Sequence, residues 1–217
     1  MFDRLRISMK FIIIFLSLIF VKTVYSEECS QILKQSLSKV EKIRDYSAIV
    51  ETFNRKGKLE ETTVYDYKYL APGYIRMKVI EGKKKGGEVF FDPKAYKVKG
   101  CKSVVFRFCK EFNPDDNDIR SIRGVRVFET SLINILKDTE RNLSNGVCSV
   151  KTEGTFDVLE INLNKKDKDV DRIVLKIGKK DSIPYVWEKY GNNQLLYKLS
   201  IKNLKTNTGL KLEDLAL

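Results

Sequence analysis

The first ordered pattern in the chain is helical. Apolar residues recur at helical spacing through residues 30–44, and lysines occupy the opposite face. Ser30 stands where an N-cap residue is expected. An amphipathic helix of this length is typical of packing against a sheet. We therefore predict a helix of about 14 residues here that covers one face of a β-structure.

From Tyr46 the spacing of apolar residues changes to two, which indicates strands with one buried face. Turn signals such as Pro72-Gly73 and Asp92-Pro93 separate the runs. A second helical stripe covers Leu132 to Leu143, after a cap at Thr130 or Ser131. The strands that this pattern predicts are residues 46–53, 61–69, 74–80, 88–91, 96–99 and 103–108, a run that resumes at Cys148, and residues 156–163, 172–177, 183–190 and 195–204.

The order of these elements indicates the fold class. A helix, a run of strands, a second helix and a second run of strands lack the βαβ alternation of a parallel sheet. We predict an α+β fold: a strongly curved, incompletely closed antiparallel β-barrel of about ten strands, with two main helices covering its concave side. No repeat or linker interrupts the pattern, so we expect a single domain over residues 27–217.

Residues 1–26 have the organisation of a secretory signal. Basic residues up to Lys10 precede the apolar run 11–21, and residues 24–26 offer a cleavage site. A membrane-spanning helix needs about 20 apolar residues, so an uncleaved anchor is the less favoured alternative. Two carboxylates directly before Cys29 disfavour a lipid-anchored cysteine. We predict export to the periplasm by a cleaved signal peptide.

Four cysteines follow the predicted signal. An even number in an oxidising compartment favours disulfides, and two bridges are the favoured count. Three pairings are compatible with the sequence, and the spacings do not match zinc knuckles. The disulfide candidates are Cys29, Cys101, Cys109 and Cys148.

The chain is basic. Lys and Arg number 41 against 29 Asp and Glu, which gives a formal net charge of +12. This charge favours attraction to an anionic surface such as lipid headgroups, or it is simply a solvated, lysine-rich surface. Nucleic-acid binding would suit the charge, but export argues against it.

The sequence contains no histidine, which excludes Ser-His-Asp triads, Cys-His pairs and histidine-ligated metals. No spacing singles out a Ser-Lys or paired-carboxylate site. The glycines and lysines of residues 82–87 lack the order of a phosphate loop, and the acids of residues 115–118 lack the glycine and glutamate of a calcium loop. We predict turns at both places, and no catalytic residue, metal or cofactor.

Tyrosines gather on one face of a predicted strand, at Tyr65, Tyr67 and Tyr69. One interpretation is a concave sheet that holds an acyl chain while tyrosine hydroxyls reach its polar edges. The alternative is an ordinary core between the sheet and its two helices.

The stretch from Pro72 to Gly82, followed by residues 86–93 and Lys97-Val98, resembles the outer-membrane lipoprotein-sorting proteins, relatives of the periplasmic lipoprotein carrier LolA. The shared rhythm is a proline, a strand of apolar-Arg-apolar type, a glycine turn and a strand that ends in Asp-Pro. Residues 45–48, directly after a helix, also fit, and the resemblance extends over residues 30–145. It implies an incomplete antiparallel barrel whose mouth is closed by helices, a cavity for lipid chains, and no catalytic residue.

We therefore expect a monomeric periplasmic protein that binds or carries lipid acyl chains or lipoproteins in envelope biogenesis, with membrane-bound donor or acceptor proteins as partners. The alternatives are a sensor or protein-interaction module with a solidly packed sheet, and an enzyme of unfamiliar type. Arg76 is the candidate headgroup partner. Strand parity predicts an apolar cavity lined by Ile75, Met77, Val79, Val89, Phe91, Leu159, Ile161, Ile173 and Leu175.

Overall fold

The computed structural model describes residues 27–103 and 107–217. The predicted signal peptide and its cleavage site lie outside the described residues, as does the middle of the predicted strand 103–108.

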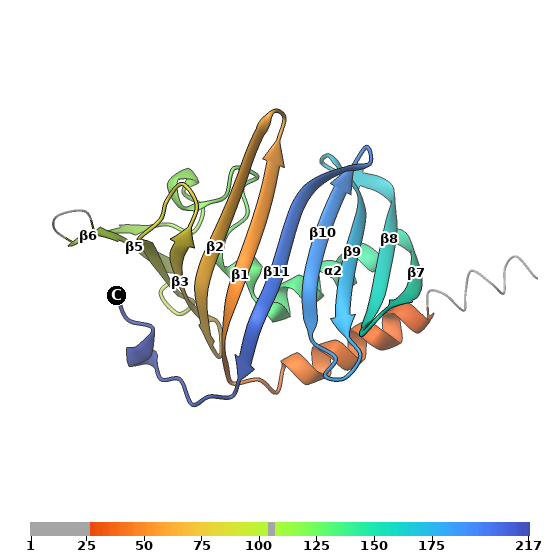
Figure 1. Cartoon of the computed structure of the whole chain (residues 1–217), viewed down its shortest axis with the longest axis horizontal. Helices are drawn as coiled ribbons and strands as arrows, with labels where there is room; N and C mark the ends of the chain where they lie inside the picture. Colours follow the sequence, from red (N-terminus) through yellow and green to blue (C-terminus); the bar gives the residue numbers. More distant parts are fainter. Residues whose placement is uncertain (1–26, 104–106) are drawn as a thin grey trace, which may run out of the picture.

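The described residues form one antiparallel sheet of eleven strands (Figure 1). Its order is β6-β5-β4-β3-β2-β1-β11-β10-β9-β8-β7, so strands that are adjacent in the sheet are consecutive in the chain except at the β1–β11 junction. The strands are β1 (Asp45–Lys56), β2 (Leu59–Leu70), β3 (Tyr74–Glu81), β4 (Gly87–Asp92), β5 (Lys97–Ser103), β6 (Arg107–Phe112), β7 (Gly146–Glu153), β8 (Phe156–Asp167), β9 (Val170–Gly178), β10 (Pro184–Gly191) and β11 (Gln194–Thr206).

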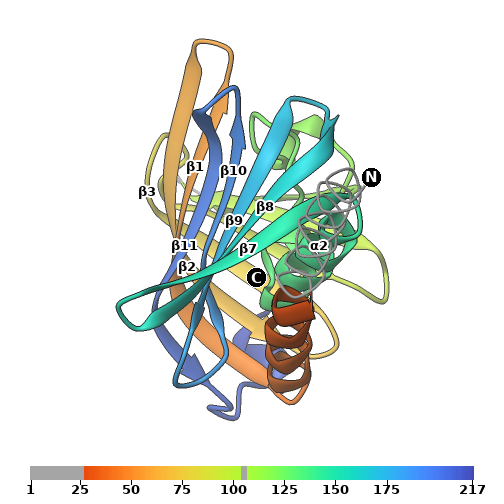
Figure 2. The same cartoon turned by 90° about the vertical axis from the view of Figure 1, so that its right-hand side faces the viewer.

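Two helices cover the concave face of this sheet (Figure 2). The first helix occupies residues 27–40, and α2 spans Leu132–Leu143. Three short 3-10 turns complete the chain: η1 (Asn117–Ile119), η2 (Val127–Thr130) and η3 (Leu212–Asp214). The sheet curls around the helices without closing, because β6 and β7 remain separate edges. The predicted fold class is confirmed, including the bounds of α2.

The structure corrects two predicted elements. The first helix covers residues 27–40, so the predicted N-cap Ser30 lies inside it, and it ends before the predicted end at residue 44. The last strand before the polar break is β6 (Arg107–Phe112), not residues 103–108. In the β5–β6 ladder Ser103 pairs with Arg107, so the predicted strand 103–108 overlaps the end of β5 and the start of β6 and is not one strand. An apolar run alone does not show where one strand ends and the next begins.

Two disulfides join the four cysteines. Cys29–Cys148 ties the first helix to β7, and Cys101–Cys109 crosses the β5–β6 hairpin. The prediction of two bridges is confirmed, and the structure selects one of the three pairings. Such bridges persist in oxidising compartments, which fits an exported protein.

The core is solid over the β7–β10 half of the sheet's inner face. Leu159 on β8 and Leu175 on β9 are fully buried, as is Leu136 on the inward face of α2. Inward residues of β7 to β10 thus pack against the two helices as a close-packed interior. No helix among the described residues combines the length and apolarity needed to cross a bilayer.

A tyrosine stack on the same inner face, over β1 and β2, holds the start of α2. Tyr46 stacks on Tyr67 and Tyr69 with ring centroids 5.7 and 4.8 Å apart. The Tyr46 hydroxyl oxygen accepts a hydrogen bond from the backbone N–H of Leu132 at 3.2 Å, which satisfies one of the free donors of the helix N-terminus. The Thr130 Oγ1 lies 3.5 Å from the Tyr67 hydroxyl. These contacts fix the segment before α2 across β1 and β2.

Candidate ligand-binding cavity

A cavity of about 450 Å³ lies between the inner face of β1 to β6 and the segment of residues 118–130. This volume falls in the range of small-molecule sites, about 300–1,000 Å³. The residues that line it are Thr52, Asn54, Glu61, Thr63, Tyr65, Met77, Val79, Lys83, Lys84, Gly87, Glu88, Val89, Gly100, Cys101, Lys102, Phe108, Lys110, Phe112, Asp118, Ile119, Arg120, Ser121, Val125, Arg126, Val127, Thr130 and Tyr197.

One wall of the cavity is apolar. Met77 and Val79 on β3 face it together with Val89 on β4, which is paired with Met77. The ring of Phe112 on β6 lies over Gly100, where an added Cβ would approach the ring to 3.0 Å. The absence of a side chain at Gly100 therefore lets the aromatic ring close the outer end of this wall.

The floor of the cavity, on β1, β2 and β11, is polar. Asn54 and Tyr197 are each 2% exposed and lie opposite each other in the β1–β11 register. Neither the Asn54 Oδ1 nor the Tyr197 hydroxyl has a hydrogen-bond partner among the described residues. Buried polar groups are normally paired, so these two atoms offer an acceptor and a donor to a bound molecule.

The tyrosine hydroxyls at the floor remain neutral. Burial raises the pKa of Tyr197 well above the ordinary range, and the neighbouring Tyr65, Glu129 and Tyr67 disfavour a phenolate further. Burial also raises the pKa of Tyr65, although hydrogen bonds with Thr63 and Thr52 act to lower it. The Tyr197 hydroxyl is therefore a hydrogen-bond donor at every physiological pH.

The rim of the cavity is basic. Four exposed lysines border it, from the β3–β4 turn and the β5–β6 hairpin, and we call them the basic mouth: Lys83, Lys84, Lys102 and Lys110. Two arginines of the rim are already paired, since Arg120 and Arg126 both contact the Asp115 carboxylate. Among the described residues, no lysine of the basic mouth has a carboxylate within ion-pair distance.

The structure divides the nine predicted cavity residues into two sets. Met77, Val79 and Val89 line the cavity. The other six are buried in the core and are not among its lining residues: Ile75, Phe91, Leu159, Ile161, Ile173 and Leu175. Strand parity selects the inward face correctly, but it does not indicate which part of that face is covered by helices.

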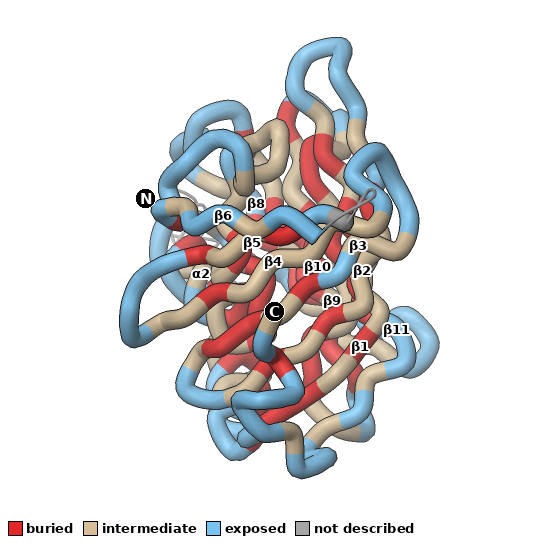
Figure 3. Tube along the Cα trace, turned by 90° about the vertical axis from the view of Figure 1, so that its left-hand side faces the viewer, coloured by how far each residue is buried: buried red, intermediate tan, exposed pale blue. Residues whose placement is uncertain are grey.

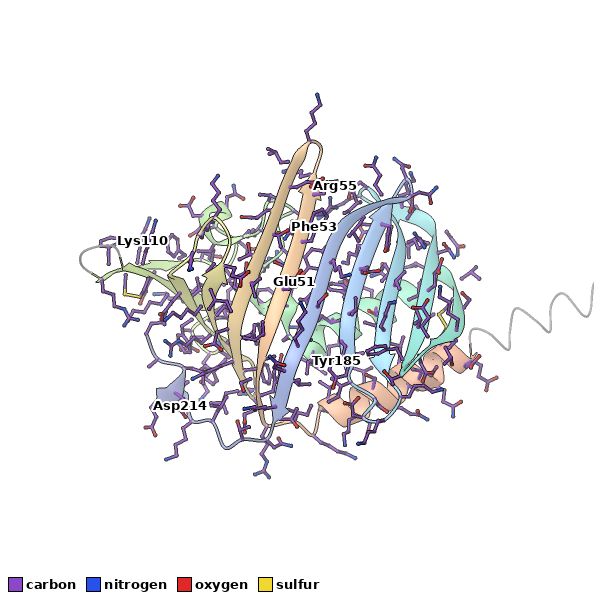
Figure 4. The ribbon with its side chains drawn as sticks, in the orientation of Figure 1. Glu51, Phe53, Arg55, Lys110, Tyr185 and Asp214 are labelled. Carbon is purple, nitrogen blue, oxygen red and sulfur yellow. A yellow bond between two sulfur atoms is a disulfide. The ribbon has the colours of Figure 1, made fainter. Side chains whose placement is uncertain are left out.

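Arg76 lies on the outer face of β3, away from the cavity wall. Its Nη2 donates to a Glu88 carboxylate oxygen at 2.9 Å, and its Nη1 donates to the backbone oxygen of Asp214 at 3.3 Å. Figure 4 shows Asp214 in the C-terminal segment at the lower edge of the sheet. The predicted headgroup partner is thus occupied by contacts within the protein and is not a cavity residue.

The polar floor was not predicted from the sequence. Asn54 lies one residue beyond the predicted strand 46–53, and Tyr197 lies within the predicted strand 195–204 with nothing in the pattern to distinguish it. The signal available was the inward parity of β1, where Thr52 and Asn54 continue the face of Ala48 and Val50 with polar residues. No cluster of residues that could hold a metal ion occurs in the part of the chain that the structure describes.

Comparisons with known proteins establish a likeness of fold. No family model matches the chain, and no curated protein matches it significantly. An uncharacterized conserved protein from Thermus thermophilus superposes with a TM-score of 0.52 at 13% identity, covering 84% of this chain and 91% of that one. MucB superposes with a TM-score of 0.52 at 12% identity, covering 85% of this chain and 61% of MucB.

A domain described as an outer membrane lipoprotein-sorting protein, from Vibrio parahaemolyticus, aligns with a TM-score of 0.43 at 13% identity, covering 88% of this chain and 97% of that one. The chain thus shares the fold of the Thermus thermophilus protein and of MucB: an open antiparallel sheet curled around two helices. The resemblance seen in residues 72–98 is confirmed at the level of the fold. At these identities the likeness carries no ligand or partner with it.

Proposed function

We propose that the protein binds, and ferries within the cell envelope, an amphiphile with an acyl chain and a hydrogen-bonding group. The observation that carries this proposal is the composition of the cavity: an apolar wall at Met77, Val79 and Val89 beside a polar floor where Asn54 and Tyr197 have no partner among the described residues. A solidly packed core would need neither the open volume nor the unpaired polar atoms.

The energetics suit a carrier. Each methylene buried against the apolar wall contributes about 0.8 kcal/mol, so eight methylenes supply about 6 kcal/mol. That free energy corresponds to dissociation in the range of tens of micromolar, before hydrogen bonds at the floor are added. The floor then selects the end of the molecule that enters first, since only a group with both donor and acceptor capacity satisfies Asn54 and Tyr197.

The test is native mass spectrometry of the mature protein, purified without detergent from its own periplasm, beside an organic extract of the same sample. We expect an added mass that matches a fatty acid, phospholipid or lipopeptide found in the extract. If the mass is that of the chain alone, and added lipid shifts neither this mass nor the fluorescence of Trp187, the proposal is wrong. Trp187 is a suitable reporter because its ring lies 5.4 Å from that of Tyr197.

A cavity-filling variant locates the binding site. Val79→Trp places an indole in the cavity and should abolish the added mass while the fold is retained. Val64→Trp is the matched control, since Val64 is half-buried on the outer face of β2 and does not line the cavity. Equal loss of ligand in both variants would place the amphiphile elsewhere.

A sensor or protein-interaction module is the second candidate function. The observation that favours it is the exposed edge of the sheet at β6, where four of the six residues are exposed (Figure 3). Such an edge can pair with a strand of another chain. A clean apo mass together with a stable complex captured from the envelope would favour this function.

A further inference from the structure

The β5–β6 hairpin carries an exposed aromatic side chain among lysines. The side chain of Phe108 is 72% exposed, the highest value among the large apolar residues of the described chain. In the strand register Phe108 lies opposite Lys102, and Lys110 follows on the same face of β6. One face of the hairpin therefore presents an apolar ring flanked by two cations.

This face adjoins the entrance of the cavity. Phe108, Lys102 and Lys110 line it together with Lys83 and Lys84 of the β3–β4 turn. Figure 4 shows Lys110 at the end of the molecule opposite the first helix. The cations and the exposed ring thus gather around one opening, at one end of the protein.

The chemistry of this end fits a lipid surface. Cations outnumber acids around the cavity: four lysines and two arginines line it against Glu61, Glu88 and Asp118, and Glu88 lies within 3.6 Å of nitrogens from Arg76, Lys78 and Arg107. Lys84 donates to the backbone oxygen of Asp118 and Lys110 lies over the Phe112 ring, but both lysines are exposed and keep donors for phosphate groups. An exposed phenyl ring gains free energy by entering the interface between headgroups and acyl chains. An acidic polymer such as heparin would match the charges but has no apolar region for Phe108 to enter.

The hairpin is braced for such contact. The disulfide between Cys101 and Cys109 links the strands one residue from the Lys102–Phe108 pair. It keeps the ring and the lysines on the same face without the ordering cost that a free loop would incur on binding.

We propose that the basic mouth and Phe108 form a docking surface for anionic phospholipid bilayers, which brings the cavity entrance against the membrane. This surface goes beyond amphiphile binding, since docking needs no molecule in the cavity. A carrier that docks in this way receives or delivers an acyl chain without exposing it to water.

The test is cosedimentation of the mature protein, stripped of bound amphiphile, with phosphatidylcholine vesicles that contain about one-third phosphatidylglycerol. We expect binding to these vesicles, none to pure phosphatidylcholine, and loss of binding at high salt. Lys102→Gln with Lys110→Gln should weaken partitioning about 25-fold, at about fivefold for each lysine. Lys179→Gln with Lys180→Gln, exposed lysines of the β9–β10 turn, removes the same charge and should change it less than about twofold.

The aromatic contribution is tested separately. Phe108→Ser should weaken partitioning about tenfold, whereas Val147→Ser on the opposite edge strand, where the side chain is 51% exposed, should have no effect. Equal losses in the test and control variants would refute the assignment of the surface. Tight binding to heparin together with no effect of Phe108→Ser would show an acidic polymer to be the partner instead. Circular dichroism checks that each variant is folded. The dependence of binding on anionic lipid and on salt is measured on the unmodified protein, so it tests the proposal even if a variant fails to fold. Cosedimentation measures docking, whereas native mass spectrometry measures occupancy of the cavity. Failure of docking and failure of amphiphile binding are therefore distinguishable.

Discussion

The Tyr197 hydroxyl offers a sharp test of the cavity floor. It is buried on β11, lines the cavity and has no hydrogen-bond partner among the described residues. Tyr197→Phe removes this hydroxyl and keeps the ring, including its edge contact with Trp187. The variant should therefore be more stable than the parent protein when the cavity is empty, and a weaker binder of the amphiphile.

The magnitude follows from the cost of an unpaired polar group. A buried hydroxyl without a partner costs about 1–3 kcal/mol. Taking the lower end, Tyr197→Phe should raise the free energy of unfolding by about 1 kcal/mol, which corresponds to an increase in Tm of about 2–4 °C for a chain of this size. Losing one hydrogen bond to the ligand should weaken binding by about 1 kcal/mol, or roughly fivefold.

Tyr46→Phe is the matched control, because the same atom is removed from a buried tyrosine whose hydroxyl is used. The Tyr46 hydroxyl oxygen accepts from the backbone N–H of Leu132, at the buried start of α2. Its removal leaves that N–H unpaired and should lower the free energy of unfolding by about 1–3 kcal/mol. The same chemical change is thus expected to have opposite signs at the two positions.

The assay is urea unfolding of the delipidated proteins, followed by circular dichroism, with ligand titration monitored by Trp187 fluorescence. If Tyr197→Phe proves less stable than the parent protein, its hydroxyl is hydrogen-bonded within the fold and the description of the floor is wrong. If it is more stable but binds the amphiphile with unchanged affinity, the hydroxyl does not contact the ligand.

Further predictions concern stability. Cys29→Ser with Cys148→Ser opens a bridge across a sequence separation of 119 and should lower the free energy of unfolding by about 5 kcal/mol through loop entropy. Cys101→Ser with Cys109→Ser, at a separation of 8, should lower it by about 2.5 kcal/mol. Thermal unfolding ranks the two variants, and the reverse order would contradict the loop-entropy argument. Burial raises the pKa of Asp45, but hydrogen bonds from the C-terminal segment outweigh it and hold the pKa below the usual value of 3.8. This stabilisation is present above the unfolded-state pKa and is lost as the pH falls through the lower folded-state pKa. Asp45→Asn should therefore lower stability at pH 7 by about 1–2 kcal/mol and flatten the pH dependence of urea unfolding in the acid range; an unchanged acid profile would assign that dependence to other groups.

Local patterns in the sequence predicted much of the fold. The bounds of α2 follow from a stripe of apolar residues, a preceding Ser131 and a terminal Asn145-Gly146. The inward faces of β3, β4, β8 and β9 follow from parity, since a pleated strand sends alternate side chains to opposite faces. Met77 and Leu175 are both buried as this rule predicts.

The sequence by itself therefore determined most of the strand content, the inward faces and the expectation of two disulfides. Only the tertiary structure decided that Met77, Val79 and Val89 border an open volume while Leu159 and Leu175 lie in solid core. It also brought Asn54 and Tyr197 together, from strands that are far apart in the chain. The physical reason is that periodicity describes one strand at a time, whereas a cavity depends on the gap between two layers. The helices and residues 118–130 form the second layer, and the way they cross the sheet sets the width of that gap.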